Sequence, residues 1–130
     1  MRRKNKEIRK IEFGKFFRIF VITLLIILIF TFIDAFIHSL KKEYSVPDYY
    51  FKNKIIFGTL YGFFSLLIIE KKNLWKKAFI FSVVVSILLQ IRYFLEGYPI
   101  DFVFGFLIIH FIILVLTSFI VLKLVSPKQL

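Results

Sequence analysis

Among the ionisable side chains within or beside the long apolar runs of this sequence, five are best suited to chemistry. They are Asp34, His38, Arg92, Glu96 and Asp101. Asp34 and His38 are four residues apart, as are Arg92 and Glu96, so each pair shares one face of a helix. A carboxylate beside an imidazole can hold a proton or a metal ion, and a carboxylate beside a guanidinium can form an ion pair. Ionisable groups that face lipid are costly, and these five can offset that cost by pairing with one another.

The apolar runs around these residues have the length of membrane-spanning helices. Residues 102–122 carry no full charge, and a helix needs about 20 apolar residues, each rising about 1.5 Å, to cross a bilayer. Of the 130 residues, 59% are hydrophobic. A soluble domain of this size would leave large apolar patches exposed to water. The sequence therefore predicts an integral membrane protein.

Four apolar runs take up the chain, which predicts one domain over residues 1–130. The expected fold class is all-α, an antiparallel bundle of four transmembrane helices with a loop at 41–54. The predicted spans are about 16–40, 55–70, 78–96 and 101–122. Gly97 is typical of a helix end and Pro99 of a helix start, so a tight turn should join the last two spans.

The second span is short. Its uncharged part, 55–69, reaches only about 23 Å as a helix, less than a hydrocarbon core of about 30 Å. Two alternatives stay open: Lys54 and Glu70 extend toward the head groups, or Tyr50 and Phe51 lengthen the helix.

Small residues predict which helix faces pack together. Gly58, Gly62 and Ser65 share one face of the second span, and small residues let another helix approach closely in lipid. Their partner lies either in this chain or in a second copy of it. On the third span, one stripe is also expected to face other helices. It comprises Ser82, Ser86, Leu89, Gln90 and Tyr93.

The basic residues indicate the orientation in the membrane. With the N-terminus in the cytoplasm, that side holds 14 Lys and Arg residues against five on the outer side: eight in 1–18, four in 70–77 and two in 123–130. Cytoplasmic loops are enriched in such residues, so both termini should be cytoplasmic in a multi-pass protein of the cell membrane. The basic segment 1–15 is expected to contact anionic lipids. Despite the net charge of +11, nucleic acid is not an expected partner, since no soluble module remains.

This orientation brings the five ionisable residues to one depth, as a polar cluster in the outer leaflet. Structural explanations compete with function at each position. Arg92 and Glu96 can form a local ion pair that reaches the interface, and Asp101 can complement the dipole of its helix. Asp34 is too short to reach the head groups, so functional and structural roles carry equal weight there.

Two further polar residues, Gln90 and His110, are predicted to lie inside the membrane. At about 100° per residue, His110 points to the helix face opposite Asp101, alongside Thr117. We interpret His110 as a neutral histidine that hydrogen-bonds across helices, in preference to a proton carrier or a metal ligand.

Metal binding is a weaker hypothesis for the polar cluster. Its carboxylates and imidazole are ligand types that zinc or manganese accept, although the spacing alone is unspecific. The candidate ligands are Asp34, His38, Glu96 and Asp101. There is no cysteine, and no zinc-protease, nucleophile-elbow, phosphate-loop or dinucleotide motif is present.

One short stretch resembles part of a known family. The order Gln90, Arg92, Glu96, Asp101 and Gly105 resembles the last two helices of VanZ-like four-helix membrane proteins. The resemblance covers about sixteen residues, and the order of the acid, glutamine and arginine differs from that family's pattern. No function is inferred from it.

Two functions remain after these observations. The favoured one is a non-enzymatic helix-packing or accessory subunit of a membrane assembly, with no cofactor and with a second copy or another membrane protein as partner. The alternative is a small transporter or metal-dependent membrane enzyme, whose outer-leaflet polar cluster binds a proton, a metal ion or a polar head group.

Overall fold

The computed structural model describes residues 2–69 and 71–125, and this part of the chain is helical throughout apart from short connections. The prediction of an all-α chain with four helices is confirmed. The helices are α1 (Arg2–His38), α2 (Asp48–Ile68), α3 (Leu74–Leu95) and α4 (Ile100–Val125), with a short 3₁₀ helix η1 (Lys42–Tyr44) between α1 and α2.

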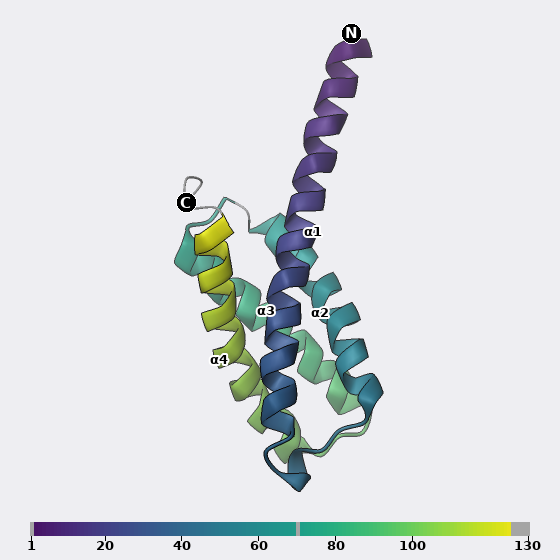
Figure 1. Ribbon diagram of the computed structural model, residues 1–130, viewed down its shortest axis with the longest axis vertical. Coiled ribbons are helices and arrows are strands. Elements are labelled where there is room, and N and C mark those ends of the chain that lie inside the picture. The colour runs from purple at the N-terminus through teal and green to yellow at the C-terminus, as the bar shows by residue number, and fades with distance from the viewer. Residues whose placement is uncertain (1, 70, 126–130) are drawn as a thin grey trace.

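The four helices run alternately in opposite directions and form a closed ring (Figure 1). Each helix packs on its neighbours in the chain, and α4 packs back on α1. The α1–α2 and α3–α4 connections lie at one end of the bundle, here called the hairpin end. The α2–α3 connection and the last turns of α4 lie at the other end, here called the terminal end. Residues from all four helices can therefore meet at one level.

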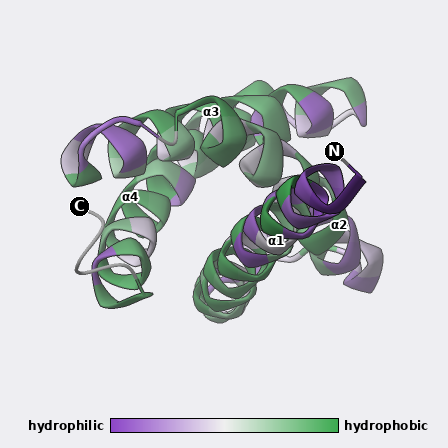
Figure 2. Ribbon diagram, turned by 90° about the horizontal axis from the view of Figure 1, so that it is seen from above, coloured by the Kyte–Doolittle hydropathy of each residue, from purple (hydrophilic) through white to green (hydrophobic). Residues whose placement is uncertain are grey.

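Helix α1 is longer than its predicted span, because the basic segment continues the same helix. Helix α1 has 37 residues, and its N-terminal part extends beyond the terminal end of the bundle (Figure 1). Residues 2–18 are exposed. Arg18 donates a hydrogen bond to the carbonyl of Val125 (3.3 Å) where α1 meets the bundle. Figure 2 shows hydrophilic residues on the projecting part and apolar residues along the rest of α1.

The predicted loop at 41–54 is too long, because α2 already begins at Asp48. Pro47 precedes the helix with an extended backbone (φ −64°, ψ 156°), and the acidic Asp48 suits the positive end of the helix dipole. Of the two alternatives for the short second span, the structure shows lengthening of the helix through Tyr50 and Phe51. Tyr50 and Lys54 thereby become helical residues that point into the bundle, since both are fully buried. Glu70 lies outside the described residues.

The α3–α4 hairpin has the form predicted. Asn73 caps the start of α3 by accepting a hydrogen bond from the Lys76 backbone N–H (3.0 Å). At the other end, Gly97 adopts φ +99°, a left-handed conformation that glycine reaches without strain. The Tyr98 N–H then bonds back to the Tyr93 carbonyl (3.2 Å), which closes the turn.

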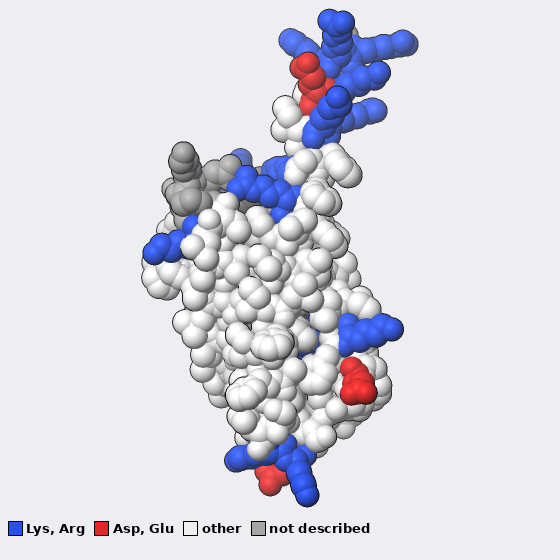
Figure 3. Space-filling model, in the orientation of Figure 1, with Lys and Arg blue, Asp and Glu red and all other residues white. Residues whose placement is uncertain are grey.

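Three of the described helices, α1, α3 and α4, are long and apolar enough to cross a membrane. Helix α2 has 21 residues but carries three charged residues near its start, Asp48, Lys52 and Lys54. Large apolar side chains such as Phe32, Ile68 and Leu95 lie exposed on the outside. Figure 3 accordingly shows mostly uncharged surface over the bundle, with Lys and Arg gathered on the projecting end of α1.

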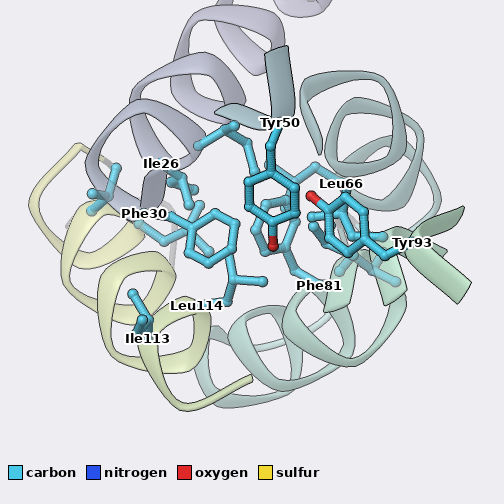
Figure 4. Packing of buried hydrophobic residues seen from close by; sticks show 14 residues of the cluster. Ile26, Phe30, Tyr50, Leu66, Phe81, Tyr93, Ile113 and Leu114 are labelled. Atoms are coloured by element: carbon cyan, nitrogen blue, oxygen red, sulfur yellow. The ribbon is translucent and has the colours of Figure 1, made fainter. Parts of the chain in front are cut away.

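The core is a column of apolar side chains along the bundle axis, contributed by every helix (Figure 4). The small-residue face of α2 packs inside this chain: a Cβ on Gly62 would lie 2.7 Å from side-chain carbons of both Thr23 and Phe81, and one on Gly58 would lie 3.3 Å from Ile27. The prediction for the α3 stripe is also confirmed, because all five of its residues are buried.

Candidate functional site: a buried ionic cluster

Three helices place ionisable side chains at one point inside the bundle. Asp34 and His38 come from α1, Lys54 from α2 and His110 from α4; we call these four residues the ionic cluster. Asp34, Lys54 and His110 are 0% exposed and His38 is 4% exposed. Burying charge in a protein interior is costly unless the charge is paired, so the partners of each group decide what the cluster can do.

Asp34 is the centre of the cluster. Its Oδ2 accepts a hydrogen bond from the Lys54 ammonium group and lies 3.1 Å from His38 Nε2. Its Oδ1 lies 3.1 Å from His110 Nε2. The expected pairing of Asp34 with His38 on one helix face is therefore present, and the same carboxylate also joins α1 to α2 and α4.

Polar and aromatic groups surround the ammonium group of Lys54. Its Nζ is 3.1 Å from His110 Nε2 and 3.3 Å from the phenol oxygen of Tyr50. The same nitrogen lies 4.3 Å from the centre of the Tyr50 ring and 5.2 Å from that of Phe30. The faces of aromatic rings attract cations, so these rings offset part of the dehydration of the ammonium group.

His38 is held by the turn that follows α1. Its Nδ1 lies 2.6 Å from the backbone carbonyl of Tyr44 in η1, and because a carbonyl only accepts, Nδ1 carries a proton. The Phe106 ring stacks on the imidazole at 4.2 Å with an interplanar angle of 5°. Nε2 faces Asp34 but makes no hydrogen bond of acceptable geometry. This nitrogen is therefore a buried polar atom aimed at the cluster.

His110 joins the cluster through the face that the sequence predicted. His110 and Thr117 are buried while Asp101 is exposed, so the expected opposition of these two faces is confirmed. Its Nε2 lies between a donor, Lys54, and an acceptor, Asp34. Its Nδ1 is buried without a hydrogen-bond partner in the described chain.

The remaining residues of the predicted polar cluster lie elsewhere. Arg92 Nε is 3.2 Å from Glu96 Oε1, which confirms that ion pair, but both side chains are about 30% exposed (31% and 30%). The Arg92 guanidinium lies over the ring of Phe57 at 3.6 Å. Asp101 is exposed at the start of α4. Among the described residues, no ion pair or hydrogen bond joins these three residues to Asp34 and His38.

Gln90, predicted to lie inside the membrane, connects two helices. Its side-chain Nε2 donates to the backbone carbonyl of Val103 (2.5 Å), and the residue is buried. The contact ties α3 to α4 near the hairpin end and has no part in the ionic cluster.

A pocket of about 380 Å³ opens at the hairpin end, and none of the four residues of the ionic cluster lines it. Two acidic side chains line it, those of Glu43 and Asp101, together with Tyr44, Tyr98 and Phe106 among others. Tyr44 and Phe106 are also the residues that contact His38. Partial burial raises the pKa of the Tyr98 phenol, which therefore remains a neutral hydrogen-bonding group at pH 7.

Lys54 is the member of the ionic cluster that the sequence did not reveal. A lysine at the edge of an apolar run is normally a group that reaches for the head groups. The available signal was its position one turn after Tyr50, which puts an aromatic ring and a phenol on the same helix face. That signal becomes readable only once α2 is known to start at Asp48.

The cluster offers three chemical capacities: it can lock helices together, exchange protons among a carboxylate and two imidazoles, or hold a cation. Comparisons with protein-family models, curated proteins and solved structures found no match to this chain. The class that the fold and site define is a small all-helical bundle with apolar surfaces and an ionic centre. Its function is interpreted from the geometry alone.

Proposed function

We propose that this chain is a multi-pass integral membrane protein of the cell membrane, with four crossing helices and cytoplasmic termini. The length and apolar character of α1, α3 and α4 support this proposal, as do the exposed apolar side chains around the bundle. Helix α2 crosses with them: its lysine Lys54 is paired inside the bundle, which removes the cost of exposing that charge to lipid.

We propose further that the protein is a non-enzymatic packing or accessory subunit of a membrane assembly. The observation that carries this proposal is that Asp34, Lys54 and His110, each from a different helix and each 0% exposed, serve as partners for one another. Such an arrangement acts as a lock, because any other alignment of α1, α2 and α4 would leave a charge buried and unpaired.

The outer surfaces suggest what the bundle contacts. The basic residues on the exposed part of α1 suit the anionic head groups of the cytoplasmic leaflet. The exposed apolar side chains suit lipid tails, a second copy of this chain or another membrane protein.

Replacing the ion pair by neutral groups tests the packing role. We expect the double variant Asp34→Asn with Lys54→Gln to fold in detergent and to keep the association state of the natural chain, since the pair remains able to hydrogen-bond. Size-exclusion chromatography with light scattering and crosslinking in membranes measure this outcome. Asp101→Asn is the matched control for loss of an exposed carboxylate. A natural chain that neither associates with itself nor crosslinks to another membrane protein would contradict the packing role.

The second candidate is a transporter or metal-dependent enzyme that handles a proton, a cation or a polar head group at the ionic cluster. The pocket at the hairpin end favours it, because two of its lining residues, Tyr44 and Phe106, contact His38. In proteoliposomes that contain a pH-sensitive dye, this candidate predicts proton flux that His38→Ala abolishes in a folded protein. The packing role predicts no flux from either protein.

A further inference from the structure

We propose that Asp34, His38 and His110 form a binding site for a divalent transition-metal ion of the zinc class. The ammonium group of Lys54 takes the place of this ion in the metal-free protein. The inference goes beyond the packing role and does not depend on it.

The donor atoms have the right kinds and spacing. One carboxylate oxygen of Asp34 and one ring nitrogen of each histidine lie within 4.8 Å of one another. Two imidazoles and a carboxylate form a common three-ligand set for zinc, with a fourth position left open. Helix α1 supplies two ligands one turn apart and α4 supplies the third, so the site needs no flexible segment.

His38 is already prepared as a ligand. Its Nδ1 donates a hydrogen bond to the Tyr44 carbonyl, so Nε2 is the ring nitrogen that is left to bind a metal ion. Histidines that bind metals usually have their other nitrogen held in this way by a carbonyl or carboxylate. Nε2 faces Asp34 with no hydrogen bond of its own, on a side chain that is 4% exposed. A cation bound there would satisfy this nitrogen.

Lys54 shows that this position suits a positive charge. Its Nζ contacts Asp34 and lies near His110 Nε2 (3.1 Å) and the phenol oxygen of Tyr50 (3.3 Å). Oxygen and nitrogen donors thus surround the ammonium group as they would surround a metal ion. Two cations cannot share this space, so metal binding requires Nζ to move away on its flexible stem. The exchange would also detach α2 from Asp34.

In this proposal the metal ion arrives through the acidic pocket, which is lined by two residues that contact His38. Glu43 and Asp101 line the pocket at the hairpin end, and carboxylates around an opening raise the local concentration of cations. Tyr44 and Phe106 line the same pocket and contact His38. Asp101, one of the candidate ligands named from the sequence, would therefore attract the ion without binding it in the site.

Cobalt and zinc titrations of the full chain test the inference. The protein is purified in detergent, stripped with a chelator and titrated with Co²⁺, and the visible absorption bands of tetrahedral Co²⁺ are recorded. We expect one Co²⁺ per chain, displaced by Zn²⁺. His38→Ala should weaken binding by about 10–100-fold or more, since even supporting residues of metal sites have effects of that size. Lys54→Met should tighten binding by about tenfold, which corresponds to about 1.4 kcal/mol.

Controls make each result decisive. Glu96→Gln removes a carboxylate outside the site and should bind Co²⁺ as the natural chain does, and the elution volume of each variant checks folding. Absence of binding by both the natural chain and Lys54→Met would overturn the site. Binding by Lys54→Met alone would overturn the exchange, and unchanged binding by His38→Ala and His110→Ala would overturn the ligand assignment. None of these results bears on association, which tests the packing role.

Discussion

The two halves of the bundle core are held by different forces. Near the hairpin end, Asp34, Lys54 and His110 join α1, α2 and α4 through charged and hydrogen-bonding groups. Toward the terminal end, Gly62 fits against Thr23 and Phe81, and contact between hydrocarbon surfaces holds the helices. Polar groups are present there too, but they are hydroxyls that bond mainly to their own helices.

The serines of the terminal half illustrate the contrast. Ser82 donates to the Ala78 carbonyl one turn earlier (2.7 Å), and its contact with Ser118 across helices is longer (3.4 Å). Such a contact adds little to the association of α3 with α4. We call the half near the hairpin end the ionic half and the half near the terminal end the close-packed half. The ionic half is stable in one alignment of the helices, because other alignments leave charges unpaired. The close-packed half is stable in any alignment that keeps the helix surfaces complementary.

Removing one partner of the ionic cluster should have the largest effect on stability. Lys54→Met leaves Asp34 buried without its cation, and the loss of one partner of a buried ion pair costs about 3–5 kcal/mol. The free energy of unfolding in detergent, from denaturant titration, measures this loss. Lys52→Met, an exposed lysine in the same helix, is the control. Equal free energies of unfolding for the two variants would mean that the buried lysine stabilises the bundle no more than an exposed lysine does.

The close-packed half should respond next, to added volume. Gly62→Ala places a Cβ 2.7 Å from Thr23 and Phe81, and overpacking typically costs about 1–3 kcal/mol. Gly105→Ala is the matched control, because a Cβ there meets nothing within 4 Å and alanine favours a helix by about 0.5–1 kcal/mol. Denaturant titration of both variants gives the comparison. A destabilised Gly105→Ala together with an unaffected Gly62→Ala would refute the assignment of the packing face.

Gln90 should have a smaller effect, because it contributes one neutral hydrogen bond. Its Nε2 donates to the Val103 carbonyl, and a typical neutral bond contributes about 0.5–1.5 kcal/mol. We expect Gln90→Leu to lower the free energy of unfolding by that amount. Hydrogen exchange of backbone amides at the α3–α4 hairpin should rise with it. Unchanged exchange would mean that this bond does not hold the hairpin.

The ion pair at the surface should have the smallest effect. Arg92 and Glu96 are both about 30% exposed (31% and 30%), and exposed pairs contribute about 0.2–1 kcal/mol. Glu96→Gln should therefore change the midpoint of thermal unfolding only slightly, and less in 1 M salt than in dilute buffer. A loss as large as that for Lys54→Met would mean that charge strength alone, irrespective of burial, stabilises the bundle.

Local patterns predicted much of this molecule. The number of helices, the turn at Gly97 and the pairing of residues one turn apart all depend on neighbours in the chain, and these features agree with the structure. The predicted start of α2 was wrong, because a loop with Tyr and Lys residues has the same composition as the end of a membrane helix. That error concealed Lys54, the buried cation that pairs with Asp34.

Hydropathy and helical periodicity are properties of a sequence read in one dimension, so they were sufficient to place Asp34 beside His38 and to turn His110 away from Asp101. Whether α4 brings His110 to Asp34 depends on how the helices rotate and slide against one another. Residues 76 positions apart meet only through that arrangement. This arrangement is favoured because an unpaired charge in a dry interior is costly. The charges are paired only when α1, α2 and α4 come together.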